Sequence, residues 1–222
     1  MSLSTYSLWQ LGEMLIIPAF FATMRMLLVS GFLSTVFGLT LGTVLVVTER
    51  GGLCQNVAVN RVLDFAVNVI RSFPFLILMI SIIPLTRLIT GSSIGEQAAI
   101  VPLTVACTPF IARIVQNSLK EVDPAIVEAA RSWGASTIQI IFKVLFKEAV
   151  PSIISGLCLA LINLLGATAV AGSIGAGGLG AVALTYGYQN FNGTIMYSIC
   201  AILVVLVVVM QYLGDWLYRR LK

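Results

Sequence analysis

Hydrophobic residues fill five long blocks of the chain, and shorter polar stretches separate these blocks. The blocks cover residues 19–48, 57–84, 94–118, 150–171 and 194–217. Each is long enough to cross a bilayer as a helix, which takes about 20 apolar residues. The pattern therefore predicts an all-α integral membrane protein with five transmembrane helices. An external segment over residues 1–18 precedes them, and a cytoplasmic tail over residues 218–222 follows.

The composition agrees with a membrane protein and limits the other classes. Hydrophobic residues make up 59% of the 222 residues and charged residues only 10%, whereas soluble domains carry about 25% charged residues. The net charge of +4 is small and scattered along the chain, so we expect contact with membrane lipid and no nucleic-acid partner. No Lys or Arg precedes Arg25, so the chain begins without the basic region of a cleavable signal peptide.

The basic residues gather in three of the polar stretches. These residues are Arg50 and Arg61, then Lys120, Arg131, Lys143 and Lys147, and finally Arg219, Arg220 and Lys222. The positive-inside rule places such stretches in the cytoplasm. We therefore expect an external amino terminus and a cytoplasmic carboxyl terminus, with the loop over residues 86–93 outside.

Residues for catalysis or metal binding are scarce. The chain has no histidine, which is the usual general base near neutral pH and the commonest metal ligand. Its four cysteines are far apart without a C-x-x-C pair, which favours free thiols over a metal site or a disulfide. No Gly-Lys pair occurs, so the phosphate loop of ATPases is missing. We expect no catalytic site, no metal and no cofactor on this chain.

A glycine-rich stretch, GSIGAGGLG, follows the fourth block at residues 172–180. It matches the dinucleotide fingerprint G-x-G-x-x-G, but it follows a membrane helix instead of a strand and has no acidic residue about 20 positions later. A turn near the outer mouth of the protein explains the stretch better. Either a tight re-entrant turn or a moving gate element fits, and the residues concerned are Gly172, Gly175, Gly177, Gly178 and Gly180.

The longest charged interruption covers residues 119–148 and holds 8 of the 22 charged residues. Asp123 followed by Pro124 predicts a helix start, because aspartate caps a helix and proline suits its first position. Gly134 suits the end of that helix. Ser136 and Gln139 have the spacing of a capping box, which predicts a second helix. The pattern indicates two short cytoplasmic helices joined at Gly134.

The first of these helices has an unusual predicted surface. Ala129 and Ala130 are small enough for a partner to approach closely, and Glu128 and Arg131 beside them can fix the register by charge pairing. Such a helix fits a cytoplasmic partner protein. An ordinary amphipathic helix lying on the membrane surface is the alternative.

The run EAARSWGASTIQIIFKVLFKEA resembles the EAA motif of the integral-membrane subunits of bacterial ABC importers. Glu128, Ala129, Ala130, Gly134 and Val144 occupy motif positions. The run departs from the motif at its end, where Phe146 replaces the usual leucine and Lys147 the usual proline. Lysine lets a helix continue where proline would break it.

The likeness extends to IRSFPFLILMISIIPLTRLITGSSIG and to GSIGAGGLGAVALTYGY, and there the chain resembles the permeases of methionine importers. This resemblance implies the type I ABC importer permease fold in a bacterial cytoplasmic membrane. It also implies a homodimer, two cytoplasmic ATPase subunits that bind ATP and Mg²⁺, and an external substrate-binding lipoprotein. An importer of another small amphiphile is the alternative, and a self-sufficient channel or secondary transporter is a more distant one.

The second block begins with four polar residues on one helical face: Arg61, Asp64, Asn68 and Arg71. Charges inside a bilayer must be paired, hydrated or close to the surface. An ion-pair network at the interface is one interpretation. The other is an inner gate formed by Arg71 and Pro74, since interrupted helices recur along transport pathways.

Asn163 and Thr168 are the main polar residues of the fourth block. Either can bond to a neighbouring helix and hold the bundle together. If the dimer axis runs along this helix, as the resemblance suggests, Asn163, Thr168 and Val170 line the pathway. Val170 is then the candidate for an apolar outer closure.

Overall fold

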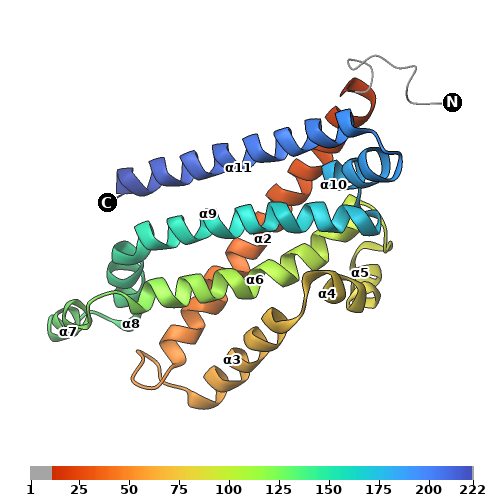
Figure 1. The fold of residues 1–222 in the computed structure, drawn as a ribbon. Helices are drawn as coiled ribbons and strands as arrows, with labels where there is room; N and C mark the ends of the chain where they lie inside the picture. Colours follow the sequence, from red (N-terminus) through yellow and green to blue (C-terminus); the bar gives the residue numbers. More distant parts are fainter. Residues whose placement is uncertain (1–11, 222) are drawn as a thin grey trace. The chain divides into compact units, whose positions relative to one another are not determined.

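The computed structural model describes residues 12–221 and contains helices but no strand over that range (Figure 1). Residues 1–11 of the predicted external segment and Lys222 of the predicted tail lie outside the described part. Four long helices fall within a few residues of the predicted blocks. They are α2 (Ile17–Thr48), α6 (Glu96–Lys120), α9 (Phe146–Ala171) and α11 (Gly193–Leu221), and a short π-helical turn, η2 (Gly12–Ile16), leads into α2.

The second predicted block is divided among three helices: α3 (Val57–Ser72), α4 (Phe75–Ser81) and α5 (Ile83–Thr90). The chain bends by 108° between α3 and α4. The break falls where the sequence predicts it, because proline cannot continue the hydrogen-bond ladder and forces Phe73 into extended backbone. The expectation of a loop over residues 86–93 is wrong for its first half. Pro84 starts α5, and Gly91 ends this helix in the left-handed conformation.

Four segments of the described chain are long and apolar enough to cross a membrane. They are Glu13–Thr48, Glu96–Lys120, Thr137–Ala176 and Gly193–Leu221. The bent pair of α3 and α4 passes the same test only when its two helices are taken together. The described residues therefore provide four membrane spans, or five if the bent pair counts as one.

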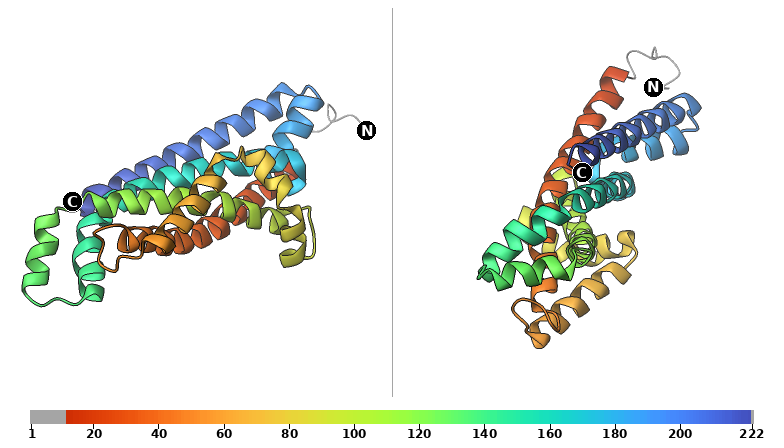
Figure 2. Two further views of the ribbon diagram at one scale, coloured as in Figure 1. Left: turned by 90° about the horizontal axis from the view of Figure 1, so that it is seen from below. Right: turned by 90° about the vertical axis from the view of Figure 1, so that its left-hand side faces the viewer.

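The second helix of the charged interruption does not stand alone, contrary to expectation. Its capping box between Ser136 and Gln139 is formed as predicted. However, α8 (Thr137–Gln139) passes through a π-helical stretch, η3 (Ile140–Leu145), directly into α9. Lysine at position 147 keeps its backbone N–H for this ladder, whereas proline would have removed it. Figure 2 shows η3 side by side with α7 (Pro124–Ser132), and the two elements are in contact.

The helices contribute to two compact units. Unit 1 comprises the described residues through Phe32, together with Pro74–Thr104 and Leu161–Val209. Unit 2 comprises Leu33–Phe73, Val105–Ala160 and the described residues from Met210 onward.

The core of unit 1 joins the start of α2, the glycine-rich segment and the start of α11. Leu179 and Ile199 are fully buried in it, beside Ala19, Val182 and Ile195. The buried Thr23 hydroxyl accepts a hydrogen bond of 2.9 Å from the backbone N–H of Leu179. Burial of these apolar side chains and this satisfied polar contact fix the segment in place.

Unit 2 depends on a close approach between α2 and α6. A Cβ added at Gly38 would lie 2.6 Å from the Ile111 side chain, and one added at Gly42 would lie 2.6 Å from the Ala112 carbonyl. Small residues at such positions let helix backbones approach each other in membrane proteins. Lys120 and Glu49 form an ion pair of 2.5 Å in the same unit.

Candidate functional site

The helix α7 projects from unit 2 and has no buried residue. Asp123 caps its start, because the carboxylate accepts a hydrogen bond of 2.9 Å from the backbone N–H of Ala125. Gly134 follows its end with a φ of +78°, a conformation that favours glycine. Both ends of the helix are therefore satisfied locally, without the burial that usually stabilises a helix of nine residues.

The predicted contact residues of α7 lie on an accessible surface. Glu128, Ala129, Arg131 and Gly134 are exposed, and Ala130 is half-buried. The sequence pattern did not single out Trp133, yet its side chain is 89% exposed. The available signal was its position between Ser132 and Gly134, because a large indole beside a helix-ending glycine lies where the chain leaves the helix. Ile138 and Phe142 in the following helix are exposed as well. We call α7 and these three large side chains the coupling surface.

A groove of about 470 Å³ separates α7 from the turn after α2. Arg131 and Glu128 line it from α7, and Arg50, Gly51 and Gly52 line it from the turn. The ion pair between Glu49 and Lys120 lies at this groove, because both residues line it. Glu128 and Arg131 thus face charged groups of their own unit, whereas the remaining part of the coupling surface, with Ala129 and Trp133, does not line the groove.

The polar stripe on α3 forms part of an ion-pair network centred on α6. The Arg113 guanidinium contacts Asp64 at 2.6 Å and donates to Asn68 at 2.8 Å and to Gln116 at 2.6 Å. The sequence pattern did not identify Arg113, although a basic residue inside an apolar block requires compensation. Arg71 and Pro74 are exposed at the end of the stripe.

Within unit 1, α9 presents one exposed face of small and weakly polar residues. Asn163, Gly166, Val170 and Ser173 are exposed, and their spacing of three, four and three residues follows one side of a helix. Thr168 does not belong to this face. It is 1% exposed, and its hydroxyl donates to the Leu165 carbonyl at 2.7 Å. Thr168 is therefore a packing residue in this conformation and does not line a pathway.

A polar groove of about 810 Å³ lies in unit 2 beside the beginning of α9. The Ser118 and Ser152 hydroxyl groups are 2.9 Å apart, and Ser152 donates to the Glu121 carboxylate at 3.1 Å. Lys147 and Glu148 also line the groove. This arrangement holds water and polar solutes more readily than lipid.

The glycine-rich segment turns as predicted, but it is more helical than a simple loop. It contains η4 (Gly172–Ala176), α10 (Gly178–Val182) and η5 (Ala183–Gln189). The turn itself uses positive φ angles at Gly175, Gly177 and Gly178. Gly172 and Gly180 are needed for another reason, because an added Cβ would collide with the backbone of Ala181 and Ala169, respectively. The segment packs against its own unit and offers no open phosphate cradle.

Residues that bind metals do not gather in the described part of the chain. No group of three or more His, Cys, Asp or Glu side chains is placed to hold an ion over residues 12–221. The four cysteines are free thiols: Cys107 is buried, Cys158 is half-buried, and Cys54 and Cys200 are exposed.

Residues 51–222 match the family described as binding-protein-dependent transport system inner membrane component. The chain belongs to this family. It is therefore a multi-pass permease component of a bacterial inner membrane. The expected fold is confirmed by solved structures of the MetNI methionine ABC transporter in inward facing conformations, one of which has a TM-score of 0.92 and 42% identity, with 100% of both chains covered.

Curated relatives of this permease include the probable D-methionine transport system permease protein MetI of Vibrio cholerae, which is 44% identical over 99% of this chain and 98% of its own length. The methionine import system permease protein MetP of Bacillus subtilis is 44% identical over 77% of both chains. The resemblance to importer permeases expected from the EAA motif is therefore confirmed.

Proposed function

We propose that the chain is the permease subunit of an ATP-driven importer for methionine or a closely related amino acid. The names of its relatives support this substrate class. In the proposed assembly, two copies of the chain form the membrane pathway. Two cytoplasmic subunits bind ATP and Mg²⁺ and hydrolyse the nucleotide, and an external lipoprotein delivers the substrate. The chain itself contributes no catalytic residue and no cofactor.

The observation that carries the proposal is that α7 has no buried residue. A capped helix with no buried residue is suited to contacting another protein, because it does not contribute to the core of its own unit. Large exposed aromatic side chains such as Trp133 are typical anchors in interfaces. The sequence has no Gly-Lys pair, and in the proposed assembly ATP hydrolysis is assigned to the partner that this helix contacts.

The exposed face of α9 supports a pathway between two copies of the chain. Asn163, Gly166 and Val170 offer one amide, one small gap and one apolar side chain, which suits a modest amphiphile. Arg71 and Pro74 are proposed for the inner gate, at the bend of the broken helix. ATP binding closes the partner subunits, α7 moves with them, and the pathway changes its access from one side of the membrane to the other.

The glycine-rich segment is proposed to form the outer rim of this pathway. Its helical packing favours a rigid rim over a moving gate, since Gly172 and Gly180 are in close contact with neighbouring backbone. We propose that α7 lies on the cytoplasmic side of the membrane and the glycine-rich segment on the external side, and the distribution of basic residues supports this orientation.

Two variants with the same charge change test the role of α7. Ala129→Arg places a long cation on the coupling surface. Gln55→Arg places the same cation on an exposed position of the turn between α2 and α3. With the purified complex in proteoliposomes, we expect Ala129→Arg to reduce ATP-driven methionine uptake at least tenfold. Gln55→Arg should transport like the unmodified protein. Both variants should be produced in normal amounts, because neither position is buried.

Gly134→Pro provides a second test, because proline cannot adopt the φ of +78° found there. This variant should uncouple ATP hydrolysis by the partner subunits from methionine transport, while the membrane helices stay folded. Unchanged coupling in both Ala129→Arg and Gly134→Pro would refute the role of α7. Uptake of another small solute in place of methionine would support the alternative substrate, and uptake by the chain without an ATPase would support a channel or secondary transporter.

A further inference from the structure

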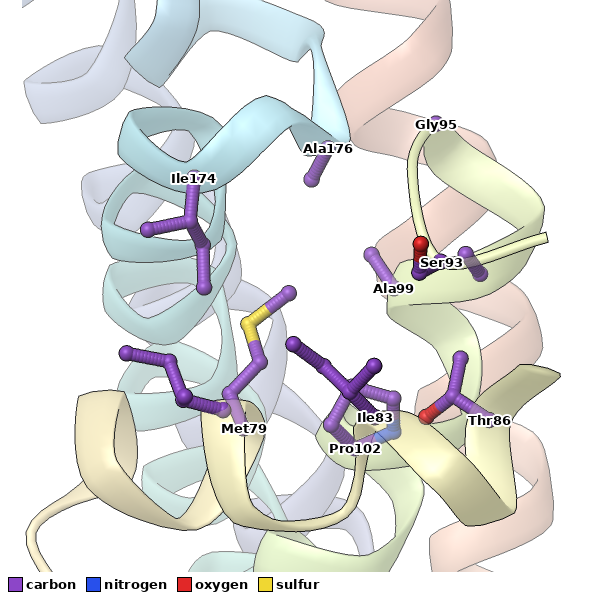
Figure 3. A pocket seen from close by; sticks show the side chains of 11 residues that line it. Met79, Ile83, Thr86, Ser93, Gly95, Ala99, Pro102, Ile174 and Ala176 are labelled. Atoms are coloured by element: carbon purple, nitrogen blue, oxygen red, sulfur yellow. The ribbon is translucent and has the colours of Figure 1, made fainter.

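A cavity of about 230 Å³ lies within unit 1 (Figure 3). The helices α4 and α5 form one wall, and the beginning of α6 and η4 form the other. The helices α4 and α5 follow one another across the single residue Ile82, and both contribute side chains to the lining. The cavity belongs to one chain and is separate from the exposed face of α9.

The wall of the cavity is almost entirely apolar. Met79, Ile83, Pro102 and Ile174 supply its large surfaces, and no charged side chain lines it. An engineered apolar cavity of about 150 Å³ holds benzene, which has six non-hydrogen atoms. By the same ratio, this cavity has room for about nine such atoms, which is more than the methionine side chain requires.

Thr86 is the polar group that distinguishes this cavity from a packing defect. Its side chain is 3% exposed, and its hydroxyl has no hydrogen-bond partner. Figure 3 shows this hydroxyl turned toward the cavity. A buried hydroxyl without a partner is destabilising, so a ligand that accepts its hydrogen bond gains affinity. The hydroxyl of Thr90, one turn later, bonds instead to backbone carbonyls of Thr86 and Ser92.

The Arg87 guanidinium lies one hydrogen bond away from the lining. Ser93 lines the cavity, and its hydroxyl accepts a hydrogen bond of 3.2 Å from the exposed Arg87 guanidinium. A carboxylate near Arg87 can be paired, whereas an amino acid buried completely would lose the hydration of both its charges. The arrangement suits a ligand with an apolar tail inside and a charged end outside.

We propose that this cavity binds the thioether side chain of the transported amino acid, with the Thr86 hydroxyl donating to the sulfur and the substrate carboxylate directed toward Arg87. The assignment of the ligand as a transported amino acid rests on the proposed function. The apolar wall favours the hydrocarbon part of the side chain, and a thioether sulfur is a weak acceptor that matches one hydroxyl.

The test uses the complete transporter in lipid nanodiscs, with methyl-¹³C methionine in its chains. The Met79 methyl group lines the cavity, and the variant Met79→Leu identifies its resonance. The probes are L-methionine and ethyl methyl sulfide, the uncharged analogue of the side chain. We expect both probes to shift the Met79 resonance in a saturable manner. ATP-driven uptake of labelled methionine, measured in proteoliposomes from the same preparation, tests the proposed function separately.

Matched variants assign the contacts. Thr86→Val should lower the affinity for both probes by about three- to tenfold, the loss expected for one hydrogen bond. Thr86→Ser should restore binding, and Thr90→Val should leave it unchanged. Arg87→Gln should lower the affinity for L-methionine and leave the affinity for ethyl methyl sulfide unchanged.

Three results would overturn the proposal. One is a Met79 resonance that neither probe shifts in a preparation with normal methionine uptake. Another is an equal loss of binding in Thr86→Val and Thr90→Val. The third is a resonance that follows only the acyl-chain length of the lipid, which would show a lipid tail in the cavity. If methionine uptake fails while Thr86-dependent binding of the sulfide persists, the proposed function fails and the cavity stands as a thioether site.

Discussion

The coupling surface and the glycine-rich segment use the same local device in opposite surroundings. Gly134 beside α7 and Gly178 at the start of α10 have nearly equal φ angles of +78° and +76°. No heavy atom lies within 4 Å of a Cβ added at Gly134, whereas one added at Gly178 would lie 2.6 Å from the Thr23 hydroxyl. α7 has no buried residue, and α10 buries Gly178, Leu179 and Val182.

This difference shows that a left-handed glycine does not by itself indicate a hinge. The glycine of α7 ends a helix whose neighbours leave it free to meet another protein. The glycine of α10 lets the backbone pass close to α2, so its conformation is part of the core of unit 1. Predictions on paired positions separate the two roles.

The largest expected effect is the loss of folded protein in Gly180→Val. A side chain at Gly180 would collide with the backbone of Ala169, which cannot move aside as a flexible side chain would. We expect a destabilisation of about 3 kcal/mol or more, the upper range for overpacking. Thermal unfolding in detergent measures it. Gly166→Val is the control, because Gly166 has no atom within 4 Å of an added Cβ. Equal losses in both variants would show that packing at Gly180 is not the cause.

The pair Gly178→Ala and Gly134→Ala compares the two regions directly. Both variants force alanine into the left-handed conformation, which costs about 1–2 kcal/mol. Gly178→Ala adds a collision with Thr23 and Met26, so it should lower the unfolding temperature by several degrees more than Gly134→Ala. Thermal unfolding of the two purified variants decides between these expectations. A larger loss for Gly134→Ala would mean that the surroundings of the two glycines do not set their sensitivity.

The smallest effect is expected for Ser136→Ala, which removes half of the capping box. The loss of such a cap costs about 1 kcal/mol at the helix start. Because α8 continues into α9, hydrogen exchange should rise only near Ser136 and leave the middle of α9 protected. Ser132→Ala is the control, since the Ser132 hydroxyl bonds only to a carbonyl of its own helix. Increased exchange along the whole of α9 would contradict a local cap.

Local features of the fold were predictable from the sequence. The cap at Asp123, the stop at Gly134, the capping box at Ser136 and the break at Pro74 each depend on residues close together in the chain. The size of the bend between α3 and α4, 108°, was not predictable, because proline marks a break in a helix without fixing the direction in which the chain continues. The continuity of η3 and α9 followed from Lys147 only after the usual proline was seen to be missing.

Contacts between distant residues account for most of what was missed. Arg113 pairs with Asp64 and Asn68, which lie more than 40 positions away in the chain. Hydrophobic periodicity does not predict which residues pair at that separation. The burial of Thr168 depends on which side of α9 faces the core, a question that two polar residues in an apolar block do not answer. The lining of the cavity at Thr86 comes from three separate stretches of the chain, so it was not visible as a motif.

The positions of the free thiols bear on the redox conditions that the permease meets. Cys54 is exposed in the turn after α2, for which we propose a cytoplasmic location, and the other three cysteines lie within the long helices α6, α9 and α11. In that orientation, the described external segments present no thiol to the oxidising side of the membrane, where disulfides form. In the proposed orientation, Cys54 faces the compartment that keeps thiols reduced. The proposed orientation therefore predicts that the permease needs no disulfide bond to fold, and that an oxidant that stays outside the cell leaves Cys54 unmodified.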